Sequence, residues 1–564
     1  MEKRWKIKET GPTEVIERLT KEINVSSVVA NLLFHRGVTT YNEAKLFFRP
    51  KLEHLHDPFL MKDIDKAVER IEKAISSREK ILVYGDYDVD GTTAVALTYS
   101  FLKTYYDKLD YYIPDRYKEG YGISKQGIDF AFENNFSLII ALDCGIKAID
   151  KVAYANEKGI DFIICDHHLP GEAIPNAVAV LDPKRKDCSY PYKELSGCGI
   201  GFKLIQALAQ KKNIPVENLE SYLDLVVISI AADIVPITGE NRILAYYGLK
   251  RLNTSPREGV RAMLELTSMK RELTISDIVF VIGPRINAAG RMESGKKAVE
   301  LLISSSTEHA MESGNYLNKN NSDRRDLDIY TTQQALAMIA ESPILQQRKT
   351  TVLFDPTWHK GVIGIVASRL TETYYRPTVM LTQSNGIVSG SARSVKDFDL
   401  YEALSACSDL LEQFGGHKFA AGLTLKPENV EAFKKKFEEV VSSTITDEML
   451  IPEIEIDAAI SLNEISPSFY NIIKQFAPFG PGNMNPVFLT ENVSDRGYAN
   501  IVGSNHLKFD VMHKEIKFPA IGFGLSAHYE YVAKKNPFSV CYNIREQEWE
   551  GKTYLQLQVK DLKK

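Results

Sequence analysis

Three aspartates within five residues directly follow an apolar run near the start of the chain. Residues 81–84 have the continuous apolar character of a buried strand, and residues 92–102 have the pattern of the following helix. Asp86, Asp88 and Asp90 are therefore expected at the carboxyl end of a strand, where open α/β sheets bind ligands. Three carboxylates this close need a cation to coexist. The stretch predicts an α/β fold with a metal site at one edge of its sheet.

The same Asp-x-Asp-x-Asp-Gly pattern also begins the calcium-binding loop of an EF-hand, but two features disfavour that interpretation. The position of the bidentate glutamate is Leu97, and the segment before the loop has strand-like rather than helical character. A solvated acidic turn without a ligand is the other alternative. It predicts no further acids or histidines at strand ends.

Three further apolar runs end in acids or histidines. Two of them, residues 137–142 and 161–165, have the pattern of buried strands, whereas residues 225–232 fit a strand or a helix equally well. Because strands that alternate with helices form parallel sheets with right-handed crossovers, the strand ends are expected at one edge. Carboxylates with one or two imidazoles suit two Mn²⁺ or Mg²⁺ ions better than a structural zinc ion. The residues that follow these runs are Asp143, Asp166, His167, His168 and Asp233.

Composition indicates the class of protein and its compartment. The chain has 564 residues, of which 44% are hydrophobic and 25% are charged, so it is globular and too long for a single core. We expect a cytoplasmic protein without membrane contact, because no apolar run is long enough to span a bilayer and no signal-peptide core follows the first residues. The six cysteines lack zinc-site spacing, and most of them are expected to be buried thiols. A net charge of -5 argues mildly against indiscriminate nucleic-acid binding, but a local basic groove is compatible with it.

The remaining patterns divide the chain into further parts. Residues 12–75 have helical apolar spacing and form a lead-in to the first lobe, and a long polar helical pattern over residues 296–341 predicts a helix that connects two lobes. A second, smaller α/β lobe begins near Thr351. Short alternating segments rich in aromatics predict a small C-terminal β-barrel. The predicted domains are residues 1–295, 296–345, 346–447 and 448–564.

These motifs together resemble those of the DHH phosphoesterases. The four segments similar to that superfamily are Asp86-Tyr-Asp-Val-Asp-Gly, Leu142-Asp-Cys-Gly, Asp166-His-His and Ala232-Asp-Ile-Val-Pro. Those similar to its RecJ branch are Arg285-Ile-Asn-Ala-Ala-Gly-Arg291, Gly390-Ser-Ala-Arg-Ser394, Gly415-Gly-His-Lys-Phe-Ala-Ala-Gly422 and Pro478-Phe-Gly-Pro-Gly-Asn483. The resemblance implies a DHH catalytic lobe, a DHHA1-type second lobe and an OB-like domain. It also implies a 5′→3′ exonuclease specific for single-stranded DNA.

The resemblance further implies a set of metal ligands. Asp143 would bridge two ions, Asp88 would bind the first, and Asp90, His167 and Asp233 would bind the second. Two ions about 3.5–4 Å apart activate a water molecule and stabilise charge on phosphoryl oxygens during in-line displacement. The expected cofactor is therefore a pair of Mn²⁺ or Mg²⁺ ions.

Two neighbours of the ligands have catalytic roles in this interpretation, and one position departs from the family. His168 would contact the phosphate or the leaving oxygen, and Asp166 would orient a neighbouring group. Many DHH enzymes have a histidine ligand where this chain has Tyr84. Asp86 or a water molecule would then complete the first site.

The other segments of the motif set predict contacts with the substrate. A guanidinium between hydroxyls, as at Arg393, suits a terminal phosphate, and a loop that mixes basic, aromatic and glycine residues surrounds Arg116, although many surface loops have this composition. The full predicted set is Arg116, Arg285, Asn287, Arg291, Ser391, Arg393, Ser394, Gly415, Gly416 and His417.

The expected partner is single-stranded DNA, and a helicase and a single-strand-binding protein are candidate protein partners of a monomer. Two alternatives belong to other classes. One is a small-molecule phosphoesterase of the same superfamily that cleaves short oligonucleotides or nucleotide signals. The other is a single-strand-binding factor with an inactive site, which the intact set of acids argues against.

Overall fold

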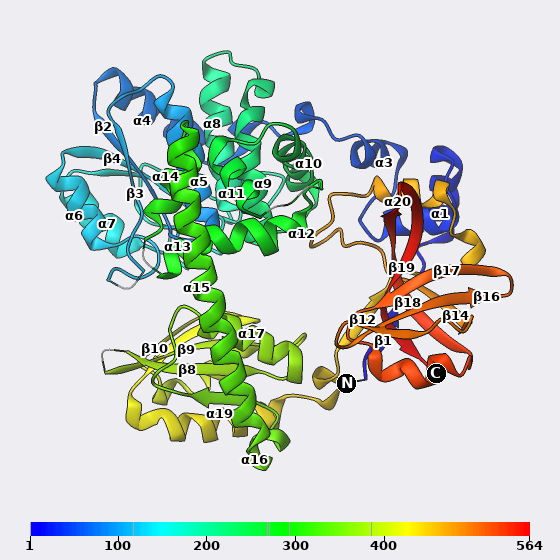
Figure 1. The fold of residues 1–564 in the computed structure, drawn as a ribbon. Helices are drawn as coiled ribbons and strands as arrows, with labels where there is room; N and C mark the ends of the chain where they lie inside the picture. Colours follow the sequence, from blue (N-terminus) through cyan, green and yellow to red (C-terminus); the bar gives the residue numbers. More distant parts are fainter. Residues whose placement is uncertain (1, 117, 268, 270, 293, 385) are drawn as a thin grey trace. The chain divides into compact units, whose positions relative to one another are not determined.

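The computed structural model describes residues 2–564 except 117, 268, 270, 293 and 385 (Figure 1). The chain forms two compact units. One comprises Met1–Lys6 and Lys319–Glu455, and the other comprises Ile7–Asn318 and Ile456–Lys564. Among the described residues, no helix combines the length and the apolar character that a membrane crossing requires. All six cysteines are buried free thiols, as predicted.

The larger unit contains a five-stranded parallel sheet. In sheet order its strands are β3 (Leu109–Tyr112), β2 (Lys80–Gly85), β4 (Phe136–Leu142), β5 (Asp161–Cys165) and β6 (Ala179–Leu181). Every pairing between neighbours is parallel, which confirms the predicted sheet. The carboxyl ends of all five strands therefore lie at one edge.

The strands are apolar on both faces because each face is covered by helices. Ile81 and Val83 of β2 enter one hydrophobic core, and Leu82 and Tyr84 enter another, as the period-two geometry of a strand requires. The first core includes residues of α4 (Ile64–Ser76), α5 (Val89–Lys103) and α8 (Gly197–Lys211); the second includes residues of α6 (Lys125–Glu133) and α7 (Ile149–Glu157).

The apolar run before Asp233 is a helix, which decides the alternative that its pattern left open. Helix α9 (Leu223–Ala232) is buried along nearly its whole length and is apolar on all sides. A helix of this kind has no polar face to reveal its period, because it packs between other helices. Asp233 follows as its C-terminal cap, and α10 (Gly239–Thr254) begins six residues later.

The long connecting helix is present but begins later than predicted. The pattern over residues 296–341 comprises two helices, α14 (Lys296–Ile303) and α15 (Thr307–Ala340), separated by Ser304, Ser305 and Ser306. Serine hydroxyls compete for backbone hydrogen bonds and favour helix caps over helix interiors. Consistent with this, the Ser306 hydroxyl accepts a hydrogen bond of 3.4 Å from the His309 amide at the start of α15.

The C-terminal segment of the larger unit is a closed β-barrel. Its sheet order is β13 (Ala458–Ala459), β14 (Phe488–Asp495), β18 (Phe538–Trp549), β19 (Lys552–Lys563), β17 (Ile516–Gly522), β16 (His506–His513) and β15 (Asn500–Val502). An additional pairing of β14 with β16 closes the ring. The barrel core includes residues of α1 (Thr13–Ile23), α2 (Ser27–Phe34) and α3 (Tyr41–Phe48) from the lead-in.

The smaller unit contains the second α/β lobe. Its sheet order is β10 (Gln413–His417), β11 (Ala420–Leu425), β9 (Ile387–Arg393), β8 (Thr378–Ser384) and β7 (Thr351–Phe354). Only the pairing of β7 with β8 is parallel among these described strands. Helices α17 (Ile363–Tyr374) and α19 (Val430–Thr444) contribute to its two cores.

Candidate metal centre and substrate sites

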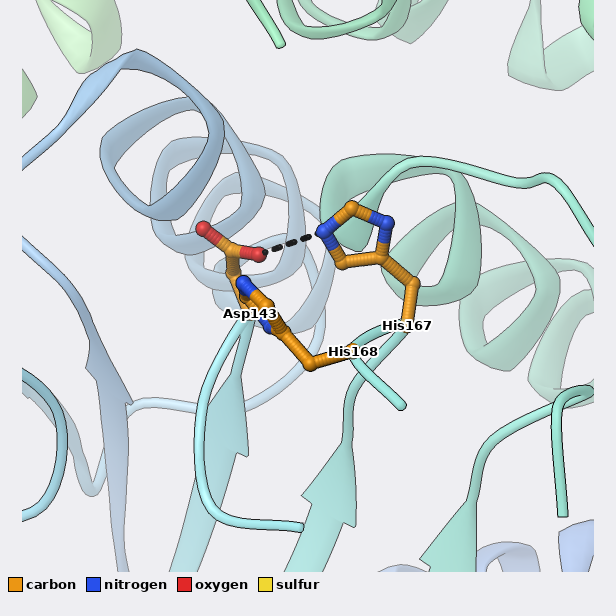
Figure 2. Close-up of side chains that lie close together, drawn as sticks. All are labelled: Asp143, His167 and His168. Atoms are coloured by element: carbon orange, nitrogen blue, oxygen red, sulfur yellow. Dashed lines mark ion pairs between the residues drawn. The ribbon is translucent and has the colours of Figure 1, made fainter. Parts of the chain in front are cut away.

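Acids and imidazoles converge at the carboxyl edge of the parallel sheet. Asp143 follows β4 and His167 follows β5, and the nearest distance between their polar atoms is 3.2 Å, from His167 Nε2 to Asp143 Oδ1 (Figure 2). His167 Nε2 also lies 3.5 Å from Asp233 Oδ2 and 3.7 Å from Asp90 Oδ2. Among the described residues, two groups have ligand atoms within 4.8 Å of one another and could hold a metal ion: Asp143 with His167 and His168, and Asp90 with His167 and Asp233.

The N-terminus of α5 positions two of the acids. Asp88 is the N-cap, and its Oδ1 accepts a hydrogen bond of 2.9 Å from the Gly91 amide. Asp90 lies in the first turn of the helix and is buried. An anion is stabilised at this end of a helix by the unpaired amides and the helix dipole. The local sequence Asp-x-Asp therefore forms a helix start with two carboxylates.

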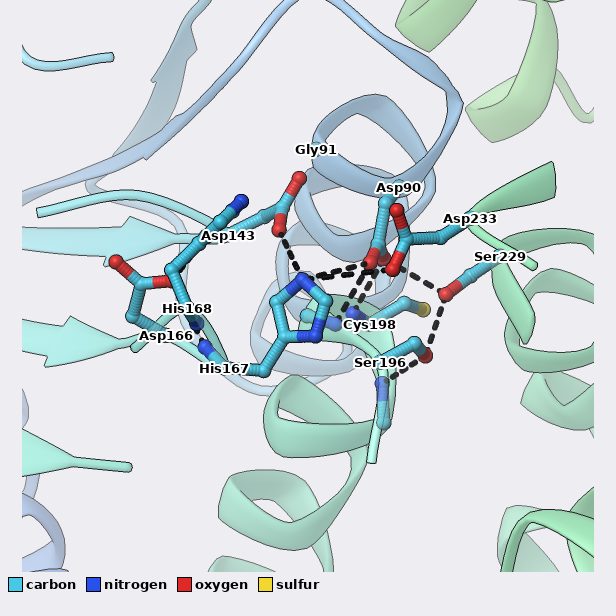
Figure 3. Close-up of polar contacts among 12 residues, drawn as sticks. Asp90, Gly91, Asp143, Asp166, His167, His168, Ser196, Cys198, Ser229 and Asp233 are labelled. Atoms are coloured by element: carbon cyan, nitrogen blue, oxygen red, sulfur yellow. Dashed lines mark hydrogen bonds and ion pairs between the residues drawn. The ribbon is translucent and has the colours of Figure 1, made fainter. Parts of the chain in front are cut away.

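Asp90 is also held from the opposite side by the N-terminus of α8 (Figure 3). Its Oδ2 accepts from the Gly197 amide at 2.7 Å, and its Oδ1 accepts from the Cys198 amide at 2.7 Å. The Ser229 hydroxyl of α9 donates to the same Oδ1 at 2.7 Å. Three elements thus fix the orientation of one carboxylate, and each oxygen still has acceptor capacity.

Asp143 is restrained by its backbone and by close packing against α8. Its backbone has φ of 59°, which is unusual for a residue other than glycine, and its amide donates to the Cys165 carbonyl at 2.8 Å. A Cβ atom on Gly197 would lie 2.6 Å from Asp143 Cβ and Oδ1, so only glycine at this position allows α8 to approach the carboxylate.

The carboxylates buried together at this edge of the sheet favour the binding of a cation. Burial, followed by the charges of Asp90 and Asp88, raises the pKa of Asp143 well above its ordinary value, and the same causes raise the pKa of Asp233 to about 8. Burial lowers the pKa of His167, so its imidazole is held neutral. Asp143 Oδ1 and both ring nitrogens of His167 are buried and make no hydrogen bond to any described residue. Carboxylate oxygens and a neutral imidazole without partners fit divalent Mn²⁺ or Mg²⁺.

Asp166 orients the two histidines rather than joining the cluster. Its Oδ1 accepts from the amides of His167 and His168 at 2.8 and 3.1 Å and lies 2.7 Å from His168 Nδ1. Its Oδ2 accepts from the Ile146 amide at 2.9 Å. Despite burial, these hydrogen bonds and the charge of His168 lower the pKa of Asp166 to about 2, and the carboxylate raises the pKa of His168 to about 9 against its own burial.

Tyr84 does not replace the missing histidine ligand. Its hydroxyl donates to the Gly122 carbonyl at 3.0 Å and accepts from the Ser124 amide at 3.1 Å, so it holds the loop that follows β3. The side chain lies in the core between the sheet and α6. Asp86 is fully buried, and burial together with the charge of Asp88 raises its pKa well above the ordinary value. Its role as an additional ligand stays a prediction.

One further acid at the same edge was missed by the sequence reasoning. Asp182 directly follows β6, and its Oδ1 accepts from the Lys184 amide at 2.7 Å. Burial raises the pKa of Asp182 to about 7, with a smaller contribution from the charge of Asp166. The signal was present in the sequence, because residues 177–181 are an apolar run that ends in an aspartate like the others.

The predicted substrate residues of the larger unit lie in two places. The guanidinium of Arg116 lies over the ring of Tyr87 at 5.3 Å, and Tyr87, Tyr121 and His168 form a chain of edge-to-face ring contacts toward the metal centre. On α13 (Gly283–Met292), Arg285 donates to Asn318 Oδ1 at 3.1 Å. The remaining two predicted residues of this helix are Asn287, which is half-buried, and Arg291, whose side chain lies outside the described part of the chain.

Five of the six predicted substrate residues of the smaller unit lie on strands β9 and β10 of its sheet. Arg393 pairs across the sheet with Ala420, which pairs with His417, so Arg393 and His417 lie on one face. Ser391 lies two residues before Arg393 on the same face, and the guanidinium Nη1 donates to its hydroxyl at 3.1 Å. Gly415 and Gly416 belong to β10, which is separated from β9 by β11. Ser394 instead donates to the Phe398 carbonyl at 3.0 Å.

Comparisons with known proteins agree with this architecture. Family profiles match residues 80–230 (DHH family, N-terminal domain), 347–443 (DHHA1 domain) and 456–561 (RecJ OB domain). The chain is 37% identical to the single-stranded-DNA-specific exonuclease RecJ of Bacillus subtilis, and the match covers 99% of this chain and 70% of that protein. It is 32% identical to the Escherichia coli protein of the same name, and that match covers 88% of each chain. A crystal structure of RecJ in complex with Mn²⁺ from Thermus thermophilus superposes with a TM-score of 0.86 at 27% identity, and the match covers 100% of this chain and 79% of that one.

Proposed function

Because this chain belongs to the RecJ family, we propose that it is a metal-dependent exonuclease that degrades single-stranded DNA from the 5′ end and releases 5′-mononucleotides in DNA repair and recombination. One observation carries the proposal. His167, with both ring nitrogens free of hydrogen bonds, faces the carboxylates of Asp90, Asp143 and Asp233 within 3.7 Å. This donor set suits the two-ion hydrolysis of a phosphodiester.

The ligand assignments are part of the proposal. Asp143 would bind both ions, Asp88 would bind the first, and Asp90, His167 and Asp233 would bind the second. The bound ions supply an activated water and charge stabilisation at the phosphoryl group. The protein's own contribution is to hold the carboxylates in place against their mutual repulsion, through the helix N-termini that donate to Asp88 and Asp90.

His168 has a separate role in the proposed reaction. Its Nδ1 is held by Asp166, and the raised pKa keeps the ring protonated at neutral pH. A protonated ring with one nitrogen bound to Asp166 donates from its other nitrogen to a phosphate oxygen or to the leaving oxygen. Asp166 is therefore a positioning residue for His168 and not a ligand.

Recognition of the strand end is proposed for the patch on β9 and β10. The side chain of Arg393 is half-buried in its lobe, donates to the hydroxyls of Ser391 and Ser368, and has no carboxylate hydrogen-bonded to it in the described structure. Such a guanidinium binds a phosphate dianion through charge-assisted hydrogen bonds, which an internal monoanionic linkage satisfies less fully. A terminal 5′-phosphate is thus preferred over a 5′-hydroxyl.

Comparing rates on 5′-phosphate and 5′-hydroxyl forms of one end-labelled oligonucleotide tests this part. Arg393→Ala is expected to remove most of the preference for the phosphate, whereas Lys435→Ala, which removes an exposed charge of α19 in the same lobe, leaves it intact. The same rate ratio in Arg393→Ala and the parent protein would exclude Arg393 as the end sensor, and Arg116 would be tested next.

Substrate class is tested by strand length. The closed barrel, matched by the RecJ OB domain, suits a single strand longer than the active site, and its binding should weaken with salt as phosphate contacts are screened. We expect complete digestion of long linear single strands and no cleavage of circular ones. Rapid cleavage of dinucleotides with stalling on long strands would instead indicate a small-molecule phosphoesterase. We further propose a cytoplasmic monomer that acts with a helicase and a single-strand-binding protein.

A further inference from the structure

A short loop that begins at the proposed ligand Asp233 contacts the motif at residues 478–483. This loop, residues 233–238, connects α9 to α10, and its far end is buried: Ile237 is 1% exposed and its amide donates to the Pro481 carbonyl at 2.7 Å. The motif lies within the barrel segment, between β13 (Ala458–Ala459) and β14 (Phe488–Asp495). The ligand-bearing loop and the barrel segment thus share a hydrogen bond.

The packing at this contact is as tight as glycine permits. A Cβ atom on Gly480 would lie 2.5 Å from Ile237 Cγ1, so no larger residue fits unless Ile237 moves. The backbone of Gly480 is held by reciprocal hydrogen bonds with Asn483, of 3.1 and 2.8 Å. Asn483 is 1% exposed and uses its amide group to donate to the carbonyls of Phe476 and Pro478, each at 2.8 Å.

Two arginines, of which Arg36 is half-buried and Arg242 is buried, anchor the motif to the rest of the larger unit. Arg36 of the lead-in donates to Asn483 Oδ1 at 2.6 Å and to the Met484 carbonyl at 2.7 Å. Arg242, in the first turn of α10, donates to the carbonyls of Phe47, Gln475, Phe476 and Ala477 at 2.8 to 3.3 Å. Helix α10 begins immediately after the ligand-bearing loop, so the loop is fixed on the motif by its own packing and by the helix that follows.

The ligand end of the loop is tied to the metal centre. The Asp233 amide donates to the Ser229 carbonyl at 2.9 Å, and the Ser229 hydroxyl donates to Asp90 Oδ1. The next residue, Ile234, has φ of 59° and is 61% exposed. A β-branched residue in the left-handed region persists only where the surrounding structure holds it. The loop that contains Ile234 is fixed three residues later by the contacts of Ile237.

We propose that residues 478–483 are a positioning element for Asp233, so that ion binding at Asp233 and attachment of the barrel to the catalytic lobe are energetically coupled. The inference rests on the proposed metal site. Coupling between two sites is reciprocal: if the motif favours the ion-binding position of Asp233, then a bound ion stabilises the motif by the same free energy. The motif therefore acts on the ion through Ile237 without touching it.

The first test measures Mn²⁺ binding to the full chain by electron paramagnetic resonance of the free ion. Gly480→Ala is expected to weaken binding by about tenfold, in the usual range of coupling between sites. Gly314→Ala, where a Cβ has only ordinary contacts of 3.4 Å or more, is the matched control and should bind as the parent does. Adding Ile237→Ala to Gly480→Ala removes the clashing atom and should restore part of the affinity, which a general loss of stability would not do.

The second test uses the unaltered protein and does not depend on the folding of any variant. Hydrogen exchange of peptides that cover residues 233–238 and 476–484 is expected to slow when Mn²⁺ is added. Unchanged exchange over residues 476–484 in protein that has bound Mn²⁺, or unchanged Mn²⁺ affinity in folded Gly480→Ala, overturns the coupling. If the unaltered protein binds no Mn²⁺, the proposed metal site itself is wrong, so the two failures are distinguishable.

Discussion

Replacing Asp233 by asparagine should stabilise the metal-free protein, although it removes a proposed ligand. Burial, followed by the charges of Asp90 and Asp88, raises the pKa of Asp233 to about 8, whereas an unfolded chain titrates this group at ~3.9. Between these two values the unfolded state releases a proton that the folded state retains. The carboxyl of Asp233 therefore destabilises the fold increasingly as the pH rises from about 4 to about 8.

The magnitude follows from the size of that pKa difference. At pH 7.5 the interval of about 3.6 pKa units corresponds to ~5 kcal/mol, at 1.36 kcal/mol per unit. Because 33% of the side chain is exposed, solvent screening reduces the effect, and we expect ~2 kcal/mol. For a unit as large as the one that contains Asp233, this free energy corresponds to a rise of about 2 °C in the melting temperature.

Differential scanning calorimetry in excess EDTA measures this effect. Asp233→Asn should melt above the parent protein at pH 7.5, and the difference should shrink at pH 5. Asp150→Asn, at a carboxylate whose side chain is 71% exposed, is the control and should show no such gain. With saturating Mn²⁺ the order should reverse, because an ion at 100 times its Kd adds ~2.7 kcal/mol to whichever protein binds it. An Asp233→Asn protein that is less stable than the parent in EDTA at pH 7.5 would refute the reasoning.

Three further predictions concern the metal centre. Asp143→Ala should abolish hydrolysis of end-labelled single strands, since the proposed site assigns this carboxylate to both ions. Substantial turnover by the folded variant, or full activity of the parent in excess EDTA, would contradict this. His168→Ala should lower the rate of hydrolysis by about 10–100-fold with little change in Mn²⁺ affinity. His167→Ala should instead weaken Mn²⁺ binding itself. If excess metal rescues His168→Ala but not His167→Ala, the two assignments are reversed. Gly197→Ala should lower Mn²⁺ affinity, because its Cβ would lie 2.6 Å from Asp143. The control Gly171→Ala, whose Cβ would have its nearest neighbour at 3.8 Å, should not lower it. Equal affinities of the two variants would show that Asp143 moves aside without cost.

Local pattern was sufficient for the sheet and for most of its polar edge. Each buried parallel strand is a short apolar run in the sequence. The residue that follows the run therefore lies at the carboxyl end of the strand. For this reason Asp86, Asp143 and Asp166 could be placed at one edge without a structure. Asp182 follows the same rule and was overlooked, although its apolar run is as clear as the others.

Several features depend on tertiary packing and have no local signal. The run before Asp233 is a helix because other helices surround it on all sides, and a uniformly apolar segment of that length does not reveal its own period. Tyr84 stands in a ligand position of the sequence motif, yet its hydroxyl is bound to the loop at Gly122 and Ser124. The break before α15 depends on serine caps whose effect a polar helical pattern conceals.

The residues of the proposed ligand set could be named from the sequence and its family resemblance, whereas the contacts that support those residues could not. Residues 13–48 share a core with the C-terminal barrel, and Ile237 meets Pro481, across separations of more than 200 residues. Contacts of this kind are decided by the complementarity of finished surfaces and leave no periodic trace in either segment. The starts of strands and helices are local features, because backbone hydrogen bonds and alternating side chains set them within a few residues. The proposed positioning of Asp233 instead depends on the buried contact between Ile237 and Pro481, which exists only once both segments have folded.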